Sequence, residues 1–236
     1  MQRWMITGAG RGIGLEIARQ ILQRGDAVIA TVRSDAAAQA LRTQFAGADA
    51  ARLQVLVFDV RDRGAIAQAS SQVTERIDVI VNNAGILGPG RQSALDTDFD
   101  GFLDALAVNA MGPLAVTQAF LPRLRRDDRA RVVWITSRMG SFASYHKDDL
   151  IAYQASKAAA NKLVRALATT LAPKGIIVIA AHPGLVRTDL AGARAADSPN
   201  SVSAGEAASG LLKVIDGLQA GDNGRFLDHA GREIPW

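Results

Sequence analysis

The chain has 236 residues, of which 48% are hydrophobic and 21% charged, and it contains no cysteine, which excludes a disulfide framework and thiolate catalysis. Its 27 basic and 23 acidic residues give a formal charge of +4, but aromatic residues make up only 5%, which argues against a nucleic-acid partner. No apolar run approaches the ~18 residues of a membrane span and no signal peptide is recognisable, so we expect a cytoplasmic protein without a membrane partner.

Apolar runs of strand length alternate with longer segments of helical period. The predicted strands are residues 4–7, 27–32, 53–58, 79–81, 132–136 and 176–180. The predicted helices are residues 14–23, 65–76, 99–124 and 153–171. This alternation predicts an α/β fold in which residues 1–236 form a single domain, a doubly wound parallel sheet of the Rossmann type with about seven strands flanked by helices.

A glycine-rich turn follows the first predicted strand, where the chain reads TGAGRGIG from Thr7 to Gly14. The glycines fall at Gly8, Gly12 and Gly14, so the literal G-x-G-x-x-G fingerprint fails at Ile13. Strand, glycine turn and helix N-terminus still direct free N–H groups towards a phosphate. A dinucleotide site is therefore predicted, although a tight turn without any nucleotide could have a similar glycine-rich sequence.

The end of the second predicted strand indicates which dinucleotide binds. Enzymes that use NAD usually carry an acidic residue there for the ribose 2′-hydroxyl, whereas this chain has Val32. Arg33 follows, and Arg11 lies in the glycine turn, so two guanidiniums can hold a 2′-phosphate. The sequence favours NADP(H) over NAD(H).

A tyrosine and a lysine share one face of the helix predicted for residues 153–171. Tyr153 and Lys157 are four residues apart, a spacing that is also common on purely structural helices. An ammonium at ~4 Å would lower a tyrosine pKa by roughly three units and make the phenol an acid–base group. Ser137, at the end of the fifth predicted strand, could hold a substrate oxygen against Tyr153, and no G-x-S-x-G elbow surrounds it.

Residues 185–203 interrupt the alternation with a long stretch of small and polar residues. Such a segment is either a lid over a substrate cleft or a plain mobile insertion. We expect a lid, because it begins beyond a strand's carboxyl end, where ligands bind in doubly wound sheets.

An ordered set of short motifs runs through residues 5–190. It comprises the glycine turn, Asp59-Val60, Asn82-Asn-Ala-Gly85, Asn109, Ser137, Tyr153/Lys157, and Pro183-Gly184 followed by Thr188. Each motif is weak, but the ordered set is specific, and it resembles the short-chain dehydrogenase/reductase family. Residues 224–236 further resemble the carbonyl reductases grouped with the C-factor and sniffer proteins.

The resemblance implies a catalytic set of Asn109, Ser137, Tyr153 and Lys157. Tyr153 would donate a proton to a carbonyl, Lys157 would bind the nicotinamide ribose and lower the tyrosine pKa, Ser137 would orient the substrate oxygen, and Asn109 would hold a water. The implied cofactor-binding residues are Gly8, Arg11, Gly12, Ile13, Gly14, Arg33, Asp59, Val60, Asn83, Ala84, Gly85, Tyr153, Lys157, Pro183, Gly184, Val186 and Thr188. Asp59 and Val60 would border the adenine, and Thr188 would contact the carboxamide.

Ser137 and Tyr153 are 16 residues apart, about three more than in the family's simplest members, with 146–149 as the insertion. Residues 139–146 should form one wall of the cleft, so Met139, Phe142 and Leu185 are the expected substrate contacts. His146 and His182 are interpreted as a loop residue and a packing residue.

These observations predict an NADPH-dependent oxidoreductase that reduces a ketone or aldehyde, or runs the reverse reaction, with Tyr153 as proton donor and no metal. A small carbonyl or alcohol would be its substrate, and a homodimer or homotetramer built on the helices of Phe99 and Tyr153 is implied by analogy. The alternative is a dinucleotide-binding signalling or sensor protein with little or no turnover. Dehydration or epimerisation stays open as a third possibility.

Overall fold

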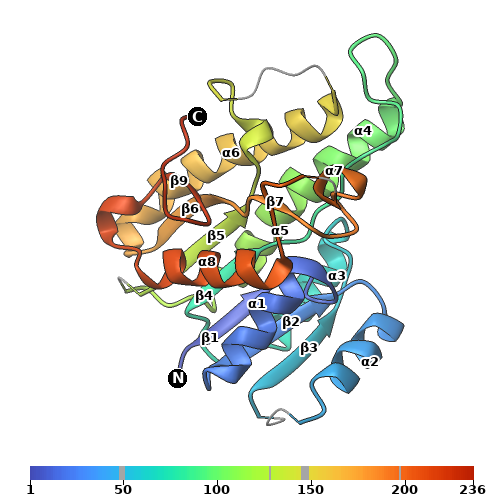
Figure 1. The fold of residues 1–236 in the computed structure, drawn as a ribbon. Helices are drawn as coiled ribbons and strands as arrows, with labels where there is room; N and C mark the ends of the chain where they lie inside the picture. Colours follow the sequence, from blue (N-terminus) through green and yellow to red (C-terminus); the bar gives the residue numbers. More distant parts are fainter. Residues whose placement is uncertain (48–50, 128, 145–148, 197) are drawn as a thin grey trace.

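Parallel strands form one central sheet in the computed structural model, which describes residues 1–47, 51–127, 129–144, 149–196 and 198–236 (Figure 1). The sheet has seven strands in the order β3-β2-β1-β4-β5-β6-β9. They are β1 (Arg3–Ile6), β2 (Ala27–Val32), β3 (Leu53–Val57), β4 (Val79–Asn82), β5 (Arg131–Ile135), β6 (Ile177–His182) and β9 (Phe226–Asp228). The expected doubly wound parallel sheet is thereby confirmed.

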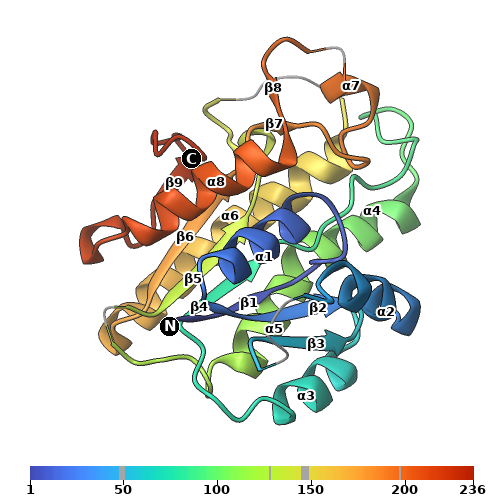
Figure 2. The ribbon, with the colours of Figure 1, turned by 60° about the horizontal axis from the view of Figure 1, so that its bottom comes forward.

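Helices cover both faces of this sheet (Figures 1 and 2). One face carries α1 (Gly12–Gln23), α2 (Asp35–Gln44) and α8 (Ala204–Asp216). The other carries α3 (Arg63–Ser71), α4 (Phe99–Leu106), α5 (Gly112–Phe120) and α6 (Ile151–Leu171). Single turns of 3-10 helix lie at Arg138–Gly140, Ala172–Lys174 and Ala220–Asp222. Because helices cover both faces, the Val/Ile/Leu runs of β1, β2, β4, β5 and β6 are buried on both sides, as the pattern predicts, whereas the edge strand β3 is only partly buried.

The strand order reverses beside β1. From β1 the chain adds β2 and β3 on one side and then returns to place β4 on the other, with Ile6 in register with Ala30 and with Val81. Ligands of open α/β sheets bind at such a switch point, beyond the carboxyl ends of the strands. The glycine turn after β1 and the residues after β4 lie at that place.

The helix expected over residues 99–124 is shorter and is interrupted. A π-helical turn, Ala107–Met111, separates α4 from α5, which ends at Phe120. The run Phe99–Phe120 is long and apolar enough to cross a membrane, but Val108 and Phe120 are buried in the sheet's core, so it is a core helix.

Several short elements differ from the expectation. The helix expected over residues 65–76 runs from Arg63 to Ser71, and α2, α8 and β9 were not predicted. The segment 185–203 contains β7 (Leu185–Val186), α7 (Ala193–Ala196) and β8 (Ser201–Val202), with β7 and β8 paired as a second small sheet. A lid role for this segment stays a prediction.

Candidate active site

The glycine turn is shaped by two residues in the left-handed region, Gly8 at φ +67° and Gly12 at φ +57°. A Cβ on Gly8 would come within 3.0 Å of Ala84 Cα, and one on Gly14 within 2.5 Å of Asn83 Nδ2. Glycine is therefore required for the turn to approach the residues after β4.

Thr7 and Asn83 hold the two sides of the switch point together. The Thr7 hydroxyl accepts hydrogen bonds of 3.0 Å from the backbone N–H groups of Asn83 and Ala84. Asn83 Nδ2 donates in return to the carbonyls of Thr7 and Gly8. Asn83 and Ala84 thus border the glycine turn, while their expected contact with a cofactor stays a prediction.

The geometry of the turn fits a dinucleotide pyrophosphate. Helix α1 begins at Gly12, and the side chain of its N-cap residue Arg11 makes no capping bond to the N–H groups of the first turn. Absent Cβ atoms at Gly8 and Gly12 leave the backbone open to close approach by a phosphate. We therefore find that Gly8, Gly12, Ile13 and Gly14 fit such a group.

Residues far along the chain reach the same turn. A Cβ on Gly12 would lie 3.3 Å from the Thr188 methyl group, so Thr188 packs against the glycine turn. Arg11 pairs with Asp189 at 3.0 Å. Pro183 and Val186, a few residues before Thr188 in the chain, are buried. Between them Gly184 takes a positive φ of +88° against the His229 ring. These residues lead from β6 to the turn.

The end of β2 also meets the turn. Ala9 N–H donates to Thr31 O at 3.0 Å, and Val32 lies 3.4 Å from where a Cβ of Gly10 would be. Arg33 is exposed, and its charge contributes to lowering the pKa of Asp59, so the two are close.

Asp59 is engaged with Arg61, and hydrogen bonds from that residue lower the carboxyl pKa. The neighbouring Val60 is buried, with its side chain against Gly112. An adenine contact by either residue stays a prediction.

Asn109 and Lys157 converge on Gly85, in the loop after β4. A Cβ on Gly85 would lie 3.1 Å from Asn109 Oδ1 and 3.6 Å from Lys157 Nζ. The π-helical turn presents Asn109, whose amide donates to Ile86 O at 2.8 Å and Ser156 Oγ at 2.9 Å, and accepts from Ile86 N–H at 2.9 Å. Asn109 therefore fastens the loop after β4 to α6. The water expected on Asn109 stays a prediction.

Tyr153 and Ser137 form the second part of the cluster. Both are nearly buried, and the Ser137 side chain lies close enough to the phenol to act on its pKa. Ser137 Oγ accepts from Met139 N–H at 3.2 Å. Burial raises the pKa of Tyr153 to about 12, against the opposing effect of the Ser137 side chain.

Lys157 lies beside Tyr153, and the lowering of the tyrosine pKa expected from it stays a prediction for the cofactor-bound enzyme, because burial dominates in the cofactor-free chain. Its ammonium donates to Ile135 O at 2.9 Å and lies 5.7 Å from the centre of the Tyr153 ring. Burial lowers the lysine pKa to about 8. The low-dielectric surroundings disfavour both charged forms, the phenolate of Tyr153 and the ammonium of Lys157.

Gln92 is a site residue that the sequence analysis missed. Its side-chain oxygen accepts from Tyr153 N–H at 3.1 Å, and its amide donates to Leu87 O and Pro89 O. The main-chain carbonyl of Gln92 accepts from Ile151 N–H. Gln92 therefore caps α6 just where Tyr153 lies. A single glutamine in a loop carries no sequence signal for such a role.

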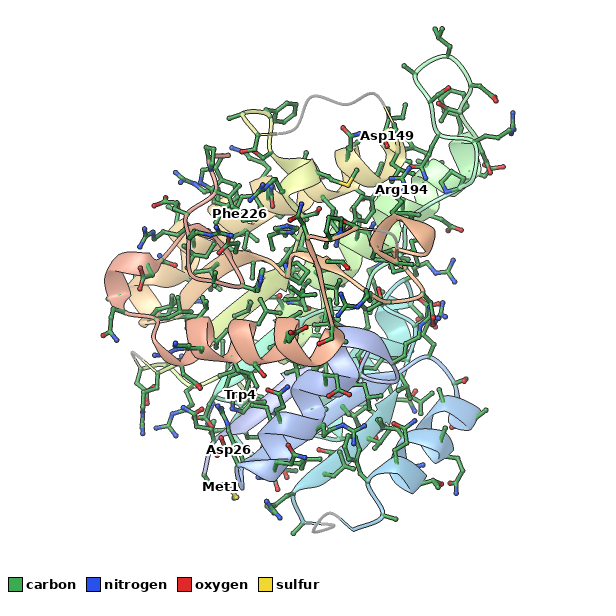
Figure 3. The ribbon with its side chains drawn as sticks, in the orientation of Figure 1. Met1, Trp4, Asp26, Asp149, Arg194 and Phe226 are labelled. Carbon is green, nitrogen blue, oxygen red and sulfur yellow. The ribbon has the colours of Figure 1, made fainter. Side chains whose placement is uncertain are left out.

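The substrate side combines the turn after β5 with the segment after β6. Met139 is half-buried, while Phe142 and Leu185 are 83% and 37% exposed. Arg194 of α7 pairs with Asp149, just before α6, at 3.2 Å (Figure 3). His146 lies outside the described residues. His182 ends β6, and burial lowers its pKa to about 4.

Comparisons with known proteins agree with this geometry. A family model described as short chain dehydrogenase matches residues 2–199. The chain is 43% identical to the C-signal protein of Myxococcus xanthus over 172 residues, which cover 72% of this chain and 99% of the relative.

Two solved structures share the whole fold. The NADPH-bound carbonyl reductase from chicken fatty liver superposes with a TM-score of 0.91 at 28% identity, covering 100% of this chain and 99% of that one. The carbonyl reductase Sniffer of D. melanogaster superposes with a TM-score of 0.90 at 25% identity, covering 100% of both chains. The resemblance carried by the ordered motifs is confirmed. The chain belongs to the short chain dehydrogenase family of oxidoreductases.

Proposed function

We propose that this chain is an NADP(H)-dependent carbonyl reductase, which interconverts a ketone or aldehyde and the corresponding alcohol. One observation carries the proposal: the Tyr153–Ser137 pair and the Lys157–Asn109 pair lie at the carboxyl edge of the sheet, beside a glycine turn that fits a dinucleotide. Relatives in the family include an NADPH-bound carbonyl reductase, which supports the same chemistry.

The roles of the side chains follow from their environments. Bound NADPH supplies the hydride. Ser137 and Tyr153 orient the carbonyl oxygen, and the phenol passes its proton to that oxygen as negative charge develops there. Because burial raises the pKa of Tyr153 to about 12, the phenol holds its proton at neutral pH, the state that a general acid needs. Lys157, whose pKa is about 8, is largely protonated there and stabilises the phenolate that remains.

Cofactor preference is the finer part of the proposal. Arg11 and Arg33 flank the place where Val32 stands instead of an acid, and both side chains are exposed to a ligand. Two guanidiniums favour a 2′-phosphate over a 2′-hydroxyl. We therefore assign NADP(H) rather than NAD(H), with Asp59, Val60, Asn83, Ala84, Gly85 and Thr188 as further cofactor contacts.

The test is consumption of NADPH by the purified chain with a panel of ketones and aldehydes. A carbonyl-dependent loss of absorbance supports the proposal. Absence of turnover with every compound, in a protein that binds NADPH, contradicts it. The family's dehydratases and epimerases would then be tested through product analysis.

A dinucleotide-binding signalling protein is the second candidate, and the similarity to the C-signal protein favours it. The two candidates predict different outcomes in cells. If the Tyr153→Phe variant kept the cellular phenotype while loss of NADP binding abolished it, signalling would be the output. If both variants lost the phenotype, the protein would act in the cell through catalysis.

The assembly is proposed from an exposed apolar face. Phe99, Leu103 and Met111 are 73%, 62% and 61% exposed on the α4–α5 helix. We propose that a second copy covers this face to give a homodimer or homotetramer in the cytoplasm. Sedimentation of the parent chain against Leu103→Glu tests it, and a parent monomer would contradict it.

A further inference from the structure

The C-terminal residues 233–236 fold back along β9 and reach the stretch that follows β5. Glu233 bridges antiparallel to Leu227, and Ile234 N–H donates to Phe226 O at 2.8 Å. Figure 1 shows this red segment beside β9 and α6. The path brings Pro235 and Trp236 to the stretch that follows β5.

Two hydrogen bonds join the tail to that stretch. The Ser141 hydroxyl donates to Pro235 O at 2.5 Å, and Phe142 N–H donates to Trp236 O at 2.8 Å. Ser141 Oγ also accepts from Ser144 N–H at 3.1 Å, so one hydroxyl connects the tail to the following turn.

The Trp236 side chain anchors these bonds. Its ring stacks on the buried Phe226 with centroids 5.3 Å apart, and the Arg165 guanidinium lies 5.6 Å from its centre (Phe226 is labelled in Figure 3). An aromatic pair and a cation–π contact both favour this position of the ring. The ring therefore holds its own main-chain oxygen in place.

The same stretch is fixed on its other side by α6. Asn161 donates to Gly140 O at 3.1 Å, and a Cβ on Gly140 would lie 2.6 Å from the backbone of Lys157. Residues 137–142 are thus held between α6, which carries Tyr153 and Lys157, and the C-terminal tail. Met139 and Phe142, the candidate substrate contacts, lie on this stretch.

We propose that Trp236 is a positioning residue for the substrate-side wall: through its main-chain oxygen and that of Pro235 it sets the main chain of Ser141 and Phe142, and so determines which carbonyl compounds fit. The substrate part rests on the proposed function. None of the described residues that contact the tail is among the proposed cofactor contacts, so we expect cofactor binding to be independent of the tail.

The test compares Trp236→Ala, Trp236→Phe and Ser141→Ala with the parent. For Trp236→Ala we expect KM for a bulky aryl ketone to rise at least about 5-fold while kcat and the NADPH dissociation constant stay within about 2-fold. Trp236→Phe keeps a stacking ring and should restore the parent's KM. Ser141→Ala removes both bonds of the hydroxyl, to Pro235 O and from Ser144 N–H, without emptying the core, and should shift KM in the same direction. Glu233→Gln is the matched control in the same tail, because that side chain faces solvent and pairs with Arg225.

A second readout does not depend on turnover. Hydrogen exchange of the Phe142 and Ser144 amides should accelerate at least about 5-fold in Trp236→Ala, and less in Trp236→Phe. Parent-like exchange and an unchanged KM in both Trp236→Ala and Ser141→Ala would overturn the proposal, as would equal weakening of NADPH binding. If the parent turns over no carbonyl but the exchange effect appears, the proposed function fails while the positioning role holds. If Trp236→Ala does not fold, Ser141→Ala decides.

Discussion

The guanidinium of Arg11 and the carboxylate of Asp189 lie 3.0 Å apart, so an ion pair joins the glycine turn to the segment after β7. Their side chains are 68% and 79% exposed, and the pair is therefore weak. We proposed Arg11 as a ligand of the cofactor's 2′-phosphate, and on that proposal Asp189 and the phosphate would compete for one guanidinium.

Replacing Asp189 with Asn should therefore strengthen NADPH binding by about 2- to 5-fold, the range of an exposed ion pair, and leave NADH binding unchanged. Calorimetric titration with each cofactor, and with 2′,5′-ADP against 5′-AMP, measures the difference. Asp216→Asn removes a remote surface acid and controls for net charge. Equal gains for NADPH and NADH would count against competition at Arg11.

The parent should prefer NADPH over NADH by about one to two orders of magnitude in kcat/KM, because only the former offers a phosphate to Arg11 and Arg33. The double substitution Val32→Asp with Arg33→Ala supplies the missing acid and removes one guanidinium, and it should erase or reverse the preference. Steady-state rates with both cofactors check this. A parent with equal efficiencies would refute the phosphate assignment.

Lys157 should cost stability in the cofactor-free chain, because its ammonium is buried and its pKa is lowered to about 8 from 10.5. The unfolded chain binds more protons than the folded chain between these two values, so this lysine makes stability rise with pH there. Lys157→Met should raise the free energy of unfolding by about 1 to 2 kcal/mol below pH 8 while abolishing turnover. The gain should shrink as pH rises from 8 to 10.5. Denaturant titrations over this range test it, and a loss of stability at pH 7 would contradict it.

His182 should make the fold acid-sensitive. Burial, with the charge of Arg138 nearby, lowers its pKa to about 4 from 6.5. The unfolded state binds the proton first as pH falls, so stability should drop between pH 6.5 and about 4, by roughly 3 kcal/mol in all. His182→Asn should flatten the upper part of this window, above the range of carboxyl titration. An unchanged slope between pH 6.5 and about 5 in the variant would exclude this histidine as its source.

The parts of the fold that rest on local pattern were predictable. Six strands of the sheet lie within about two residues of their expected bounds, because uninterrupted Val/Ile/Leu runs fit strands covered on both faces. Strand β9 escaped prediction since Phe226–Asp228 is too short to show a pattern, and its place is fixed by pairing with β6.

The candidate site was predictable in its residues but not in its contacts. Motif order indicated Tyr153, Lys157 and Asn109, yet the bond from Lys157 to Ile135 O and the cap that Gln92 gives to α6 depend on tertiary packing. The Arg11–Asp189 pair joins residues 178 positions apart, which no local pattern encodes. Burial likewise sets the direction of the Tyr153 pKa in the cofactor-free chain, and the extent of that burial follows from tertiary packing.

The most direct test of the account is the turnover of Tyr153→Phe, a change that removes one hydroxyl from a nearly buried side chain. With NADPH and the best carbonyl of the panel, kcat should fall at least about 100-fold, the scale of general acid catalysis, while the NADPH dissociation constant stays near that of the parent. A kcat within a few-fold of the parent's would show that the Tyr153 phenol is not the proton donor.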